Sequence, residues 1–189
     1  MIANANKFRS IAFLITLFFC NAVLMGDMVF NNTINDIYQI YPNHAGVVNF
    51  IVSGRSVFGV LFSLLAGMLI KSSGDRSIII TGVTLTLLGT VFLLAIHNPY
   101  YMAAMRVVSG AGLAFCLVAC ISALNSRYMD LGQRSKMMGN FNGVQAVFGI
   151  IFSIVSGNLA AISPNLAYGI YWIYLPLLLM TIIFFSDRS

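Results

Sequence analysis

Long apolar runs alternate with short polar segments along the whole chain. Six runs approach the roughly 20 residues that an α-helix needs to cross a bilayer core; they cover residues 10–32, 46–70, 77–96, 100–124, 138–161 and 166–185. The runs are continuous, whereas strands of a membrane barrel alternate apolar and polar positions. The pattern predicts an all-α polytopic membrane protein in which residues 1–189 form a single six-helix domain.

Basic residues between these runs fall on one side of the predicted membrane only. The connections 31–45, 97–99 and 162–165 contain none, whereas the other connections and the ends hold eight: Lys7, Arg9, Lys71, Arg76, Arg127, Arg134, Lys136 and Arg188. The positive-inside rule therefore predicts that both termini are cytoplasmic in a multi-pass protein of the cell membrane. Tyr168, Tyr171 and Trp172 cluster at the opposite end of the last run, which is typical of the headgroup layer.

Composition supports this class. Hydrophobic residues make up 59% of the chain and charged residues only 8%, whereas soluble domains carry about 25% charged residues. The net charge of +5 comes from scattered basic residues and not from the clustered face that nucleic acid requires, so the expected surroundings are a lipid bilayer. We find no phosphate-binding loop, nucleophile elbow or zincin motif, and expect neither an enzyme nor a cofactor.

The cysteines point to packing rather than to a metal. Cys116 and Cys120 lie four residues apart, which suits a pair of ligands only if a second pair exists. Cys20 is the one remaining cysteine in the sequence. We therefore expect small packing residues and no metal site.

Small residues recur at four-residue steps in two of the runs. The second run has Gly59, Ser63 and Gly67, and the fifth has Gly149, Ser153 and Gly157. Such faces let helix backbones approach closely in lipid. Because the two runs cross the membrane in opposite directions, the match is what a 3+3 inverted repeat would leave. The alternative is chance, since glycine and serine are common in membrane helices.

Three ionisable residues remain inside the runs: Asp27, Arg55 and Arg106. Each costs about 2.5–3.5 kcal/mol at the centre of a membrane helix, so such residues usually face a bundle interior or a water-filled cavity. All three fall in the predicted outer half, where one cavity would accommodate them. Asp27 and Arg106, with Asn31 nearby, form either a structural link between two runs or a proton or substrate site. For Arg55 the alternative is snorkelling to the outer interface.

The residues of two motifs carry a family resemblance. Gly67, Leu69, Gly74 and Arg76 match a loop pattern G-x-L-x-D-R-x-G-R-R, with Lys71 at the acidic position, and Arg106, Gly110 and Gly112 match R-x-x-x-G-x-G. Asp27 with Asn32 is similar to the acidic and amide positions near the end of the first helix in drug-exporting branches. On these residues the chain resembles the N-terminal six-helix half of the major facilitator superfamily.

The resemblance implies a secondary transporter that works by alternating access, as half of a twelve-helix architecture. It implies proton-coupled transport of a small organic molecule, such as drug or metabolite efflux, with Arg106 tuning the protonation of Asp27. It also implies a partner: a missing C-terminal half or a second chain. In the family this loop carries a charge relay that steadies the outward-facing state, and the resemblance implies that Lys71 at the acidic position would repel Arg76 instead of accepting it. Two alternatives are organic-anion uptake through Arg55 and Arg106, and a membrane interaction module that does not transport.

Overall fold

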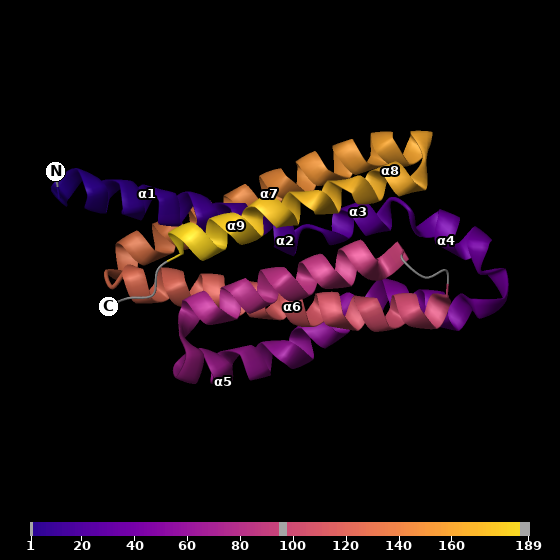
Figure 1. Cartoon of the computed structure of the whole chain (residues 1–189), viewed down its shortest axis with the longest axis horizontal. Coiled ribbons are helices and arrows are strands. Elements are labelled where there is room, and N and C mark those ends of the chain that lie inside the picture. The colour runs from indigo at the N-terminus through magenta and orange to yellow at the C-terminus, as the bar shows by residue number, and fades with distance from the viewer. Residues whose placement is uncertain (1, 95–97, 186–189) are drawn as a thin grey trace.

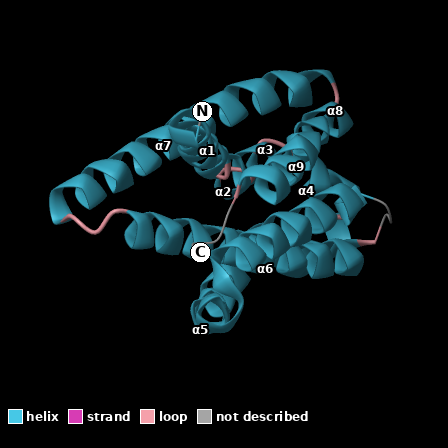
Figure 2. Ribbon diagram, turned by 60° about the vertical axis from the view of Figure 1, so that its left-hand side comes forward, coloured by secondary structure: helices cyan, strands magenta, loops and turns pink. Residues whose placement is uncertain are grey.

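The computed structural model describes residues 2–94 and 98–185, and every regular element within these ranges is a helix (Figure 2). The all-α prediction is thus confirmed. The elements are α1 (Ile2–Phe19), α2 (Asn21–Leu24), α3 (Asp27–Asn31), α4 (Ile34–Ile40), η1 (Pro42–His44), α5 (Ala45–Val91), η2 (Phe92–Leu94), α6 (Pro99–Arg127), α7 (Leu131–Ile162), α8 (Pro164–Tyr168), η3 (Gly169–Ile173) and α9 (Tyr174–Phe184).

Within the described ranges, five segments are long and apolar enough to cross a membrane: Ser10–Asn31, Pro42–Val91, Pro99–Arg127, Leu131–Ile162 and Pro164–Phe184. The second has 50 residues, which as a straight helix would extend about 75 Å against a hydrocarbon core of about 30 Å. Gly74, with φ 77° and ψ 161°, interrupts α5 in a backbone region that is essentially restricted to glycine. The chain reverses there (Figure 1), so the predicted run 46–70 forms the first arm of α5, and residues 77–91 of the predicted run 77–96 form the second.

The predicted basic connections gather at one end of the bundle. In Figure 1 the Gly74 turn of α5 and the connection from α6 to α7 lie towards the left, whereas α4 and α8 lie towards the right. Lys71, Arg76, Arg127 and Arg134 belong to those left-hand segments. Arg188 lies outside the described residues. The arrangement agrees with the charge partition, while the assignment of that end to the cytoplasm stays a prediction.

The segment between the first two predicted spans is helical and not an open loop. We expected a connection at 31–45, but α4 and η1 occupy most of it. Ile37 of α4 is buried in the core, and the hydroxyl of Tyr38 donates a hydrogen bond to Asn49 on α5. These contacts anchor the segment on the beginning of α5.

Glycines bring the second arm of α5 against α6. A Cβ atom on Gly82 would lie 2.6 Å from the backbone nitrogen of Cys116, and one on Gly89 would lie 2.6 Å from that of Ser109. Gly112 fills the reciprocal position, where a Cβ would lie 2.6 Å from the carbonyl oxygen of Gly82. This is backbone-to-backbone packing of the kind that small residues permit in lipid.

We expect Gly82→Ala to lower the free energy of unfolding by about 1–3 kcal/mol, because the added methyl group must push two backbones apart. The matched control is Gly139→Ala on α7, where nothing lies within 4 Å of the added Cβ. That control should be neutral or slightly stabilising, since alanine favours a helix over glycine by about 1 kcal/mol. Thermal unfolding in detergent measures both variants. Equal effects of the two substitutions would contradict the close packing of α5 on α6.

The two small-residue faces contact other parts of the same chain. A Cβ on Gly59 would lie 3.4 Å from Leu113 on α6, and one on Gly149 would lie 3.2 Å from the sulfur of Met25. A Cβ on Gly157 would lie 3.6 Å from the side chain of Asn32. These three glycines therefore pack against side chains of the same chain, and a role of the two faces in binding a second chain stays a prediction. Gly67 has nothing within 4 Å.

Candidate functional site

The first membrane span is broken, although the sequence predicts one continuous helix over 10–32. Turns at Cys20 and at Met25–Gly26 separate α1, α2 and α3. Around these turns the backbone bonds join residues three apart, as in Val23 N to Cys20 O (3.0 Å) and Met28 N to Met25 O (3.1 Å). Such a tightened segment is often functional, and it leaves carbonyl groups that need other partners.

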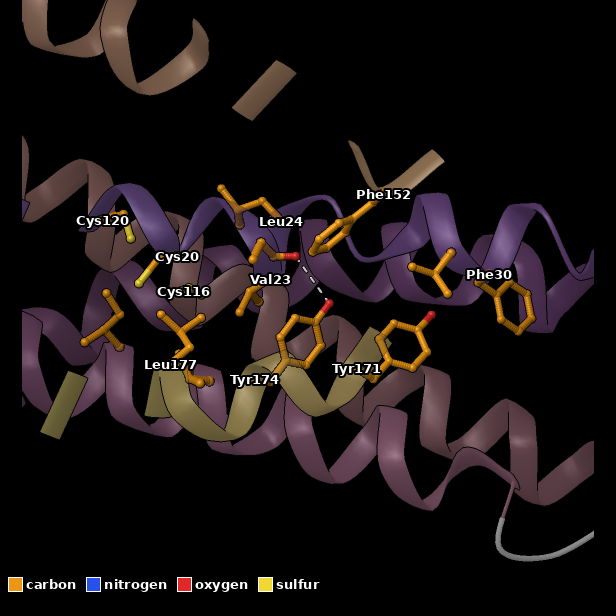
Figure 3. Packing of buried hydrophobic residues seen from close by; sticks show 14 of the residues in the cluster. Cys20, Val23, Leu24, Phe30, Cys116, Cys120, Phe152, Tyr171, Tyr174 and Leu177 are labelled. Atoms are coloured by element: carbon orange, nitrogen blue, oxygen red, sulfur yellow. Dashed lines mark hydrogen bonds between the residues drawn. The ribbon is translucent and has the colours of Figure 1, made fainter. Parts of the chain in front are cut away.

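Side chains from α5, η3 and α9 bind the carbonyl groups of this broken segment. Val23 O and Gly26 O also accept long backbone bonds, from Gly26 N (3.4 Å) and Val29 N (3.3 Å), so the side chains supplement a weakened backbone ladder where lipid offers no hydrogen bonds. Figure 3 shows Tyr171 and Tyr174 pointing towards the broken segment. The bonds are Arg55 Nη2 to Val23 O (2.7 Å), Tyr174 Oη to Ala22 O (3.3 Å) and Tyr171 Oη to Gly26 O (3.2 Å).

Three tyrosines form a column because η3 is a 3₁₀ helix, in which side chains three residues apart eclipse one another. The ring centroids of Tyr168 and Tyr171 are 6.1 Å apart, and those of Tyr171 and Tyr174 are 5.7 Å apart. The hydroxyl of Tyr168 meets that of Thr33, 2.6 Å away. Tyr168 and Tyr171 are buried within the protein, whereas Trp172 is 60% exposed, so of these three only Trp172 is open to a headgroup layer.

Gly26 has no side chain and so leaves room for Tyr174 and Arg55 beside the broken segment. A Cβ atom at this position would lie 2.0 Å from the hydroxyl oxygen of Tyr174 and 3.3 Å from Nη1 of Arg55. Its backbone is in the right-handed helical region, so close approach rather than unusual dihedral angles requires glycine here. Asp27 follows directly, at the first position of α3.

Asp27, Arg55 and Arg106 meet at one point. The Oδ1 atom of Asp27 lies 2.9 Å from Nη1 of Arg55 and 2.7 Å from Nη2 of Arg106. Both arginine side chains are buried, whereas that of Asp27 is 25% exposed. Arg55 therefore does not snorkel to the interface. We call these three residues the charged trio; one carboxylate and two guanidinium groups give it a formal charge of +1.

A backbone carbonyl and an aromatic ring fix Arg106, the second arginine of the charged trio. The Nε–H of Arg106 donates to the carbonyl of Ile51 on α5 (2.8 Å). The guanidinium carbon of Arg106 lies 4.1 Å from the centroid of Phe30, which is a cation–π arrangement. Arginine presents several donors in a planar fork and so binds an acid and a carbonyl together.

The two glycines that follow Arg106 in the motif let α6 approach α5 closely. A Cβ on Gly110 would lie 2.6 Å from the carbonyl oxygen of Arg55, so α6 and the first arm of α5 touch beside the charged trio. Gly112 instead faces the second arm, where a Cβ would lie 2.5 Å from the backbone nitrogen of Thr86. The R-x-x-x-G-x-G pattern thus places α6 against both arms of α5.

The two asparagines after Asp27 differ in their contacts. Asn31 lies one turn beyond Asp27 and is exposed, so the structure does not bring it into the charged trio. Asn32 donates from Nδ2 to the carbonyl of Ser153 (2.9 Å) and to the hydroxyl of Ser156 (2.7 Å). Asn32 therefore ties the first span to α7. Sequence reasoning missed Ser156, which is buried.

The loop motif contacts the last helix. Gly74 makes the turn of α5, and Arg76 donates from Nη2 to the carbonyl of Ile182 on α9 (2.7 Å). Leu69, Lys71 and Ser63 lie on the arm before the turn; the first two are exposed and Ser63 is half-buried. The motif therefore joins the turn inside α5 to the end of α9.

The cysteines are closer together than the sequence indicated. Cys20 lies at the break between α1 and α2, and its sulfur joins those of Cys116 and Cys120, all three within 4.8 Å of one another. Our expectation of no metal site rested on the lack of a second cysteine pair. The fold supplies a third thiol from another helix, which spacing along the chain does not reveal.

Long apolar helices around an ionic cluster are typical of a polytopic membrane protein with a functional site inside its helix bundle. The sequence profile of the Major Facilitator Superfamily matches residues 13–188, and the chain belongs to this family. Comparison with curated proteins gave no match. Membership supports membrane transport as the general activity, in a lipid bilayer and on a small-molecule substrate. Proteins of this family are generally not enzymes.

Proposed function

We propose that the chain transports a small organic molecule in a proton-coupled cycle, with Asp27 as the group that takes up and releases the proton. The observation that carries this proposal is the charged trio itself. One partly exposed carboxylate is the acidic partner of two buried arginines from two other helices. Ionisable groups inside a membrane protein are expensive and commonly mark proton and substrate paths.

Protonation of Asp27 would act on the position of the first span. As an anion, Asp27 holds α3 to Arg55 on α5 and to Arg106 on α6. A neutral acid loses most of this attraction, because Coulomb energy needs both charges. The guanidinium groups are then available to a substrate, and the first span is freed from α5 and α6. Loss or gain of one proton at Asp27 thus shifts the equilibrium between two arrangements of the helix bundle, as alternating access requires.

We further propose that a second six-helix half or a second chain completes the transporter. We also propose that the protein lies in the cell membrane with both of its termini on the cytoplasmic side. The first arm of α5 and α7 support a second half or chain, because both expose large apolar side chains: Val60, Leu61, Leu64, Met68, Ile150, Ile151 and Ile154. Lipid covers part of such a surface, and a facing half would cover the rest.

Proton movement in everted vesicles tests the proposal. The chain is expressed in cells together with the half or second chain that completes it, and everted membrane vesicles are prepared. A pH-sensitive dye reports proton flux when neutral, cationic and anionic organic compounds are added one at a time. We expect at least one compound to move protons, and Asp27→Asn to abolish that response. Asp36→Asn is the matched control, since Asp36 lies on α4 and is not part of the charged trio. An unchanged response in a folded Asp27→Asn protein would overturn the assignment.

The formal charge of the charged trio favours a second candidate, uptake of an organic anion. Arg55 supports it, because its buried Nε atom has no hydrogen-bond partner within the described ranges. The two candidates differ in their competitors. Simple carboxylates should block transport if the arginines bind the substrate, whereas a site for neutral or cationic compounds should tolerate them.

A further inference from the structure

Three thiols from two distant parts of the chain form a buried cluster, which we call the thiol cluster. Cys116 and Cys120 lie one turn apart on α6 and so share a face, while Cys20 comes from the break in the first span. All three are free cysteines and are fully buried. Their sulfur atoms lie within 4.8 Å of one another, and Figure 3 shows the three residues at one end of the buried core.

The backbone around the thiol cluster is held firmly. Gly82 packs so closely that a Cβ on it would lie 2.6 Å from the backbone nitrogen of Cys116. The cysteines belong to the apolar core together with Leu24 and Leu177. Three sulfur atoms within 4.8 Å of one another, on a supported backbone, are a ligand set for a soft, three-coordinate centre.

The net charge of the complex decides which bound ion or element fits the thiol cluster. Three thiolates around a divalent cation leave one net negative charge, and around a monovalent cation they leave two. The thiol cluster itself contains no cation and lies in the apolar core, where burial of an unpaired charge is costly. A trivalent thiophilic element gives a neutral complex with three thiolates and avoids this cost.

We propose that the thiol cluster is a binding site for trivalent arsenic or its heavier congener antimony. Arsenous acid reaches the site as a neutral molecule, As(OH)₃. Three S–H and three As–O bonds break, three As–S and three O–H bonds form, and three water molecules leave. The oxidation state of arsenic does not change, so the step needs no oxidant or reductant. This site is independent of the proposed proton coupling.

Binding would join the first span to α6 at a second point. Cys20 precedes Asp27 by seven residues on the same predicted span, and the thiol cluster shares no residue with the charged trio. An arsenic or antimony atom bound by all three sulfurs would cross-link the broken segment of the first span to α6. The site thus gives trivalent arsenic a way to restrain the span that carries Asp27.

Titration of the purified full-length chain with arsenite alone tests the proposal. The protein is kept reduced with a phosphine, which does not compete as a thiol would. We expect one arsenic per chain by native mass spectrometry, and three sulfur neighbours by X-ray absorption at the arsenic edge. Zinc added alone should bind more weakly than arsenite. Absence of arsenic binding, two sulfur neighbours, or tighter binding of zinc would each overturn the proposal.

A shifted-thiol variant supplies the matched control. Cys20→Ala combined with Phe19→Cys keeps three thiols but moves one to an exposed position, since Phe19 is 42% exposed. We expect affinity for arsenite to fall at least about 100-fold, because loss of supporting groups around a metal site alone costs 10–100-fold. Wild-type affinity in this variant would show that thiol number, and not the cluster, governs binding. The absorption measurement on the wild-type chain decides the case if the variant does not fold.

Discussion

Asp27→Ala should lower the free energy of unfolding by about 3–5 kcal/mol, the cost of removing one partner from a buried ion pair. The reason is that Arg55 and Arg106 remain buried while their shared acid is gone. Neither arginine reaches bulk water without rearrangement, because both also bind backbone carbonyls, of Val23 and Ile51. Denaturant unfolding in mixed detergent–lipid micelles measures the effect.

Two further variants separate the loss of charge from the loss of a side chain. Asp36→Ala on α4 removes an acid outside the charged trio and should change stability by less than about 0.5 kcal/mol, as ordinary surface substitutions do. The triple variant Asp27→Leu, Arg55→Met and Arg106→Met should recover most of the stability, because apolar replacement of a whole buried ion cluster is often neutral or stabilising. If the triple variant is less stable than Asp27→Ala, uncompensated charge is not the cause.

Gly26→Ala should destabilise the protein by about 1–3 kcal/mol, as overpacking of a close contact does. The added methyl group would lie 2.0 Å from the hydroxyl of Tyr174, so the ring or the first span must move. Movement also weakens the bond from that hydroxyl to the carbonyl of Ala22. Thermal unfolding in detergent measures the loss.

Tyr174→Phe is the matched partner for Gly26→Ala because it removes the clashing oxygen atom. The nearest remaining ring atom, Cζ, is 3.3 Å from the added methyl group, which a small shift relieves. The double variant should therefore be more stable than the two single effects predict, with a coupling of about 0.5–3 kcal/mol, the range for residues in contact. Strict additivity would show that Gly26 is not required by its contact with Tyr174.

The spans and the charged trio could be predicted because membrane insertion leaves a strong trace in the sequence. Apolar runs of bilayer length and one-sided basic connections follow from the cost of moving charge into lipid. The same cost singled out Asp27, Arg55 and Arg106, and the structure places these three together. Their roles in transport remain proposals.

The break in the first span could not be predicted, because its supports lie far away along the chain. Residues 20–26 read as an ordinary apolar run. The groups that bind their carbonyls are Arg55, Tyr171 and Tyr174, which are 32, 145 and 152 residues from their partners. A three-residue spacing of tyrosines was the available signal. It suits a 3₁₀ helix, but amphipathic rings near a span end first suggest the headgroup layer.

The thiol cluster could not be predicted from the sequence either. Cys116 and Cys120 stand out as a helical pair, but Cys20 joins them only because α1 ends just before it, at Phe19, and α6 packs beside this turn. Spacing along the sequence contains no information on this contact. Pair counting therefore led to the expectation of simple packing.

Infrared difference spectroscopy tests the central claim, proton exchange at Asp27, most directly. The sequence has five acidic residues, all aspartates, and Asp27 alone among them lies inside a predicted span. A carboxylic acid in this environment gives a C=O band distinct from that of a carboxylate. We predict that adding a transported compound to the reconstituted protein changes this band, and that Asp27→Asn removes the change. A substrate-induced spectrum without a carboxyl change, or one that persists in Asp27→Asn, would contradict the account.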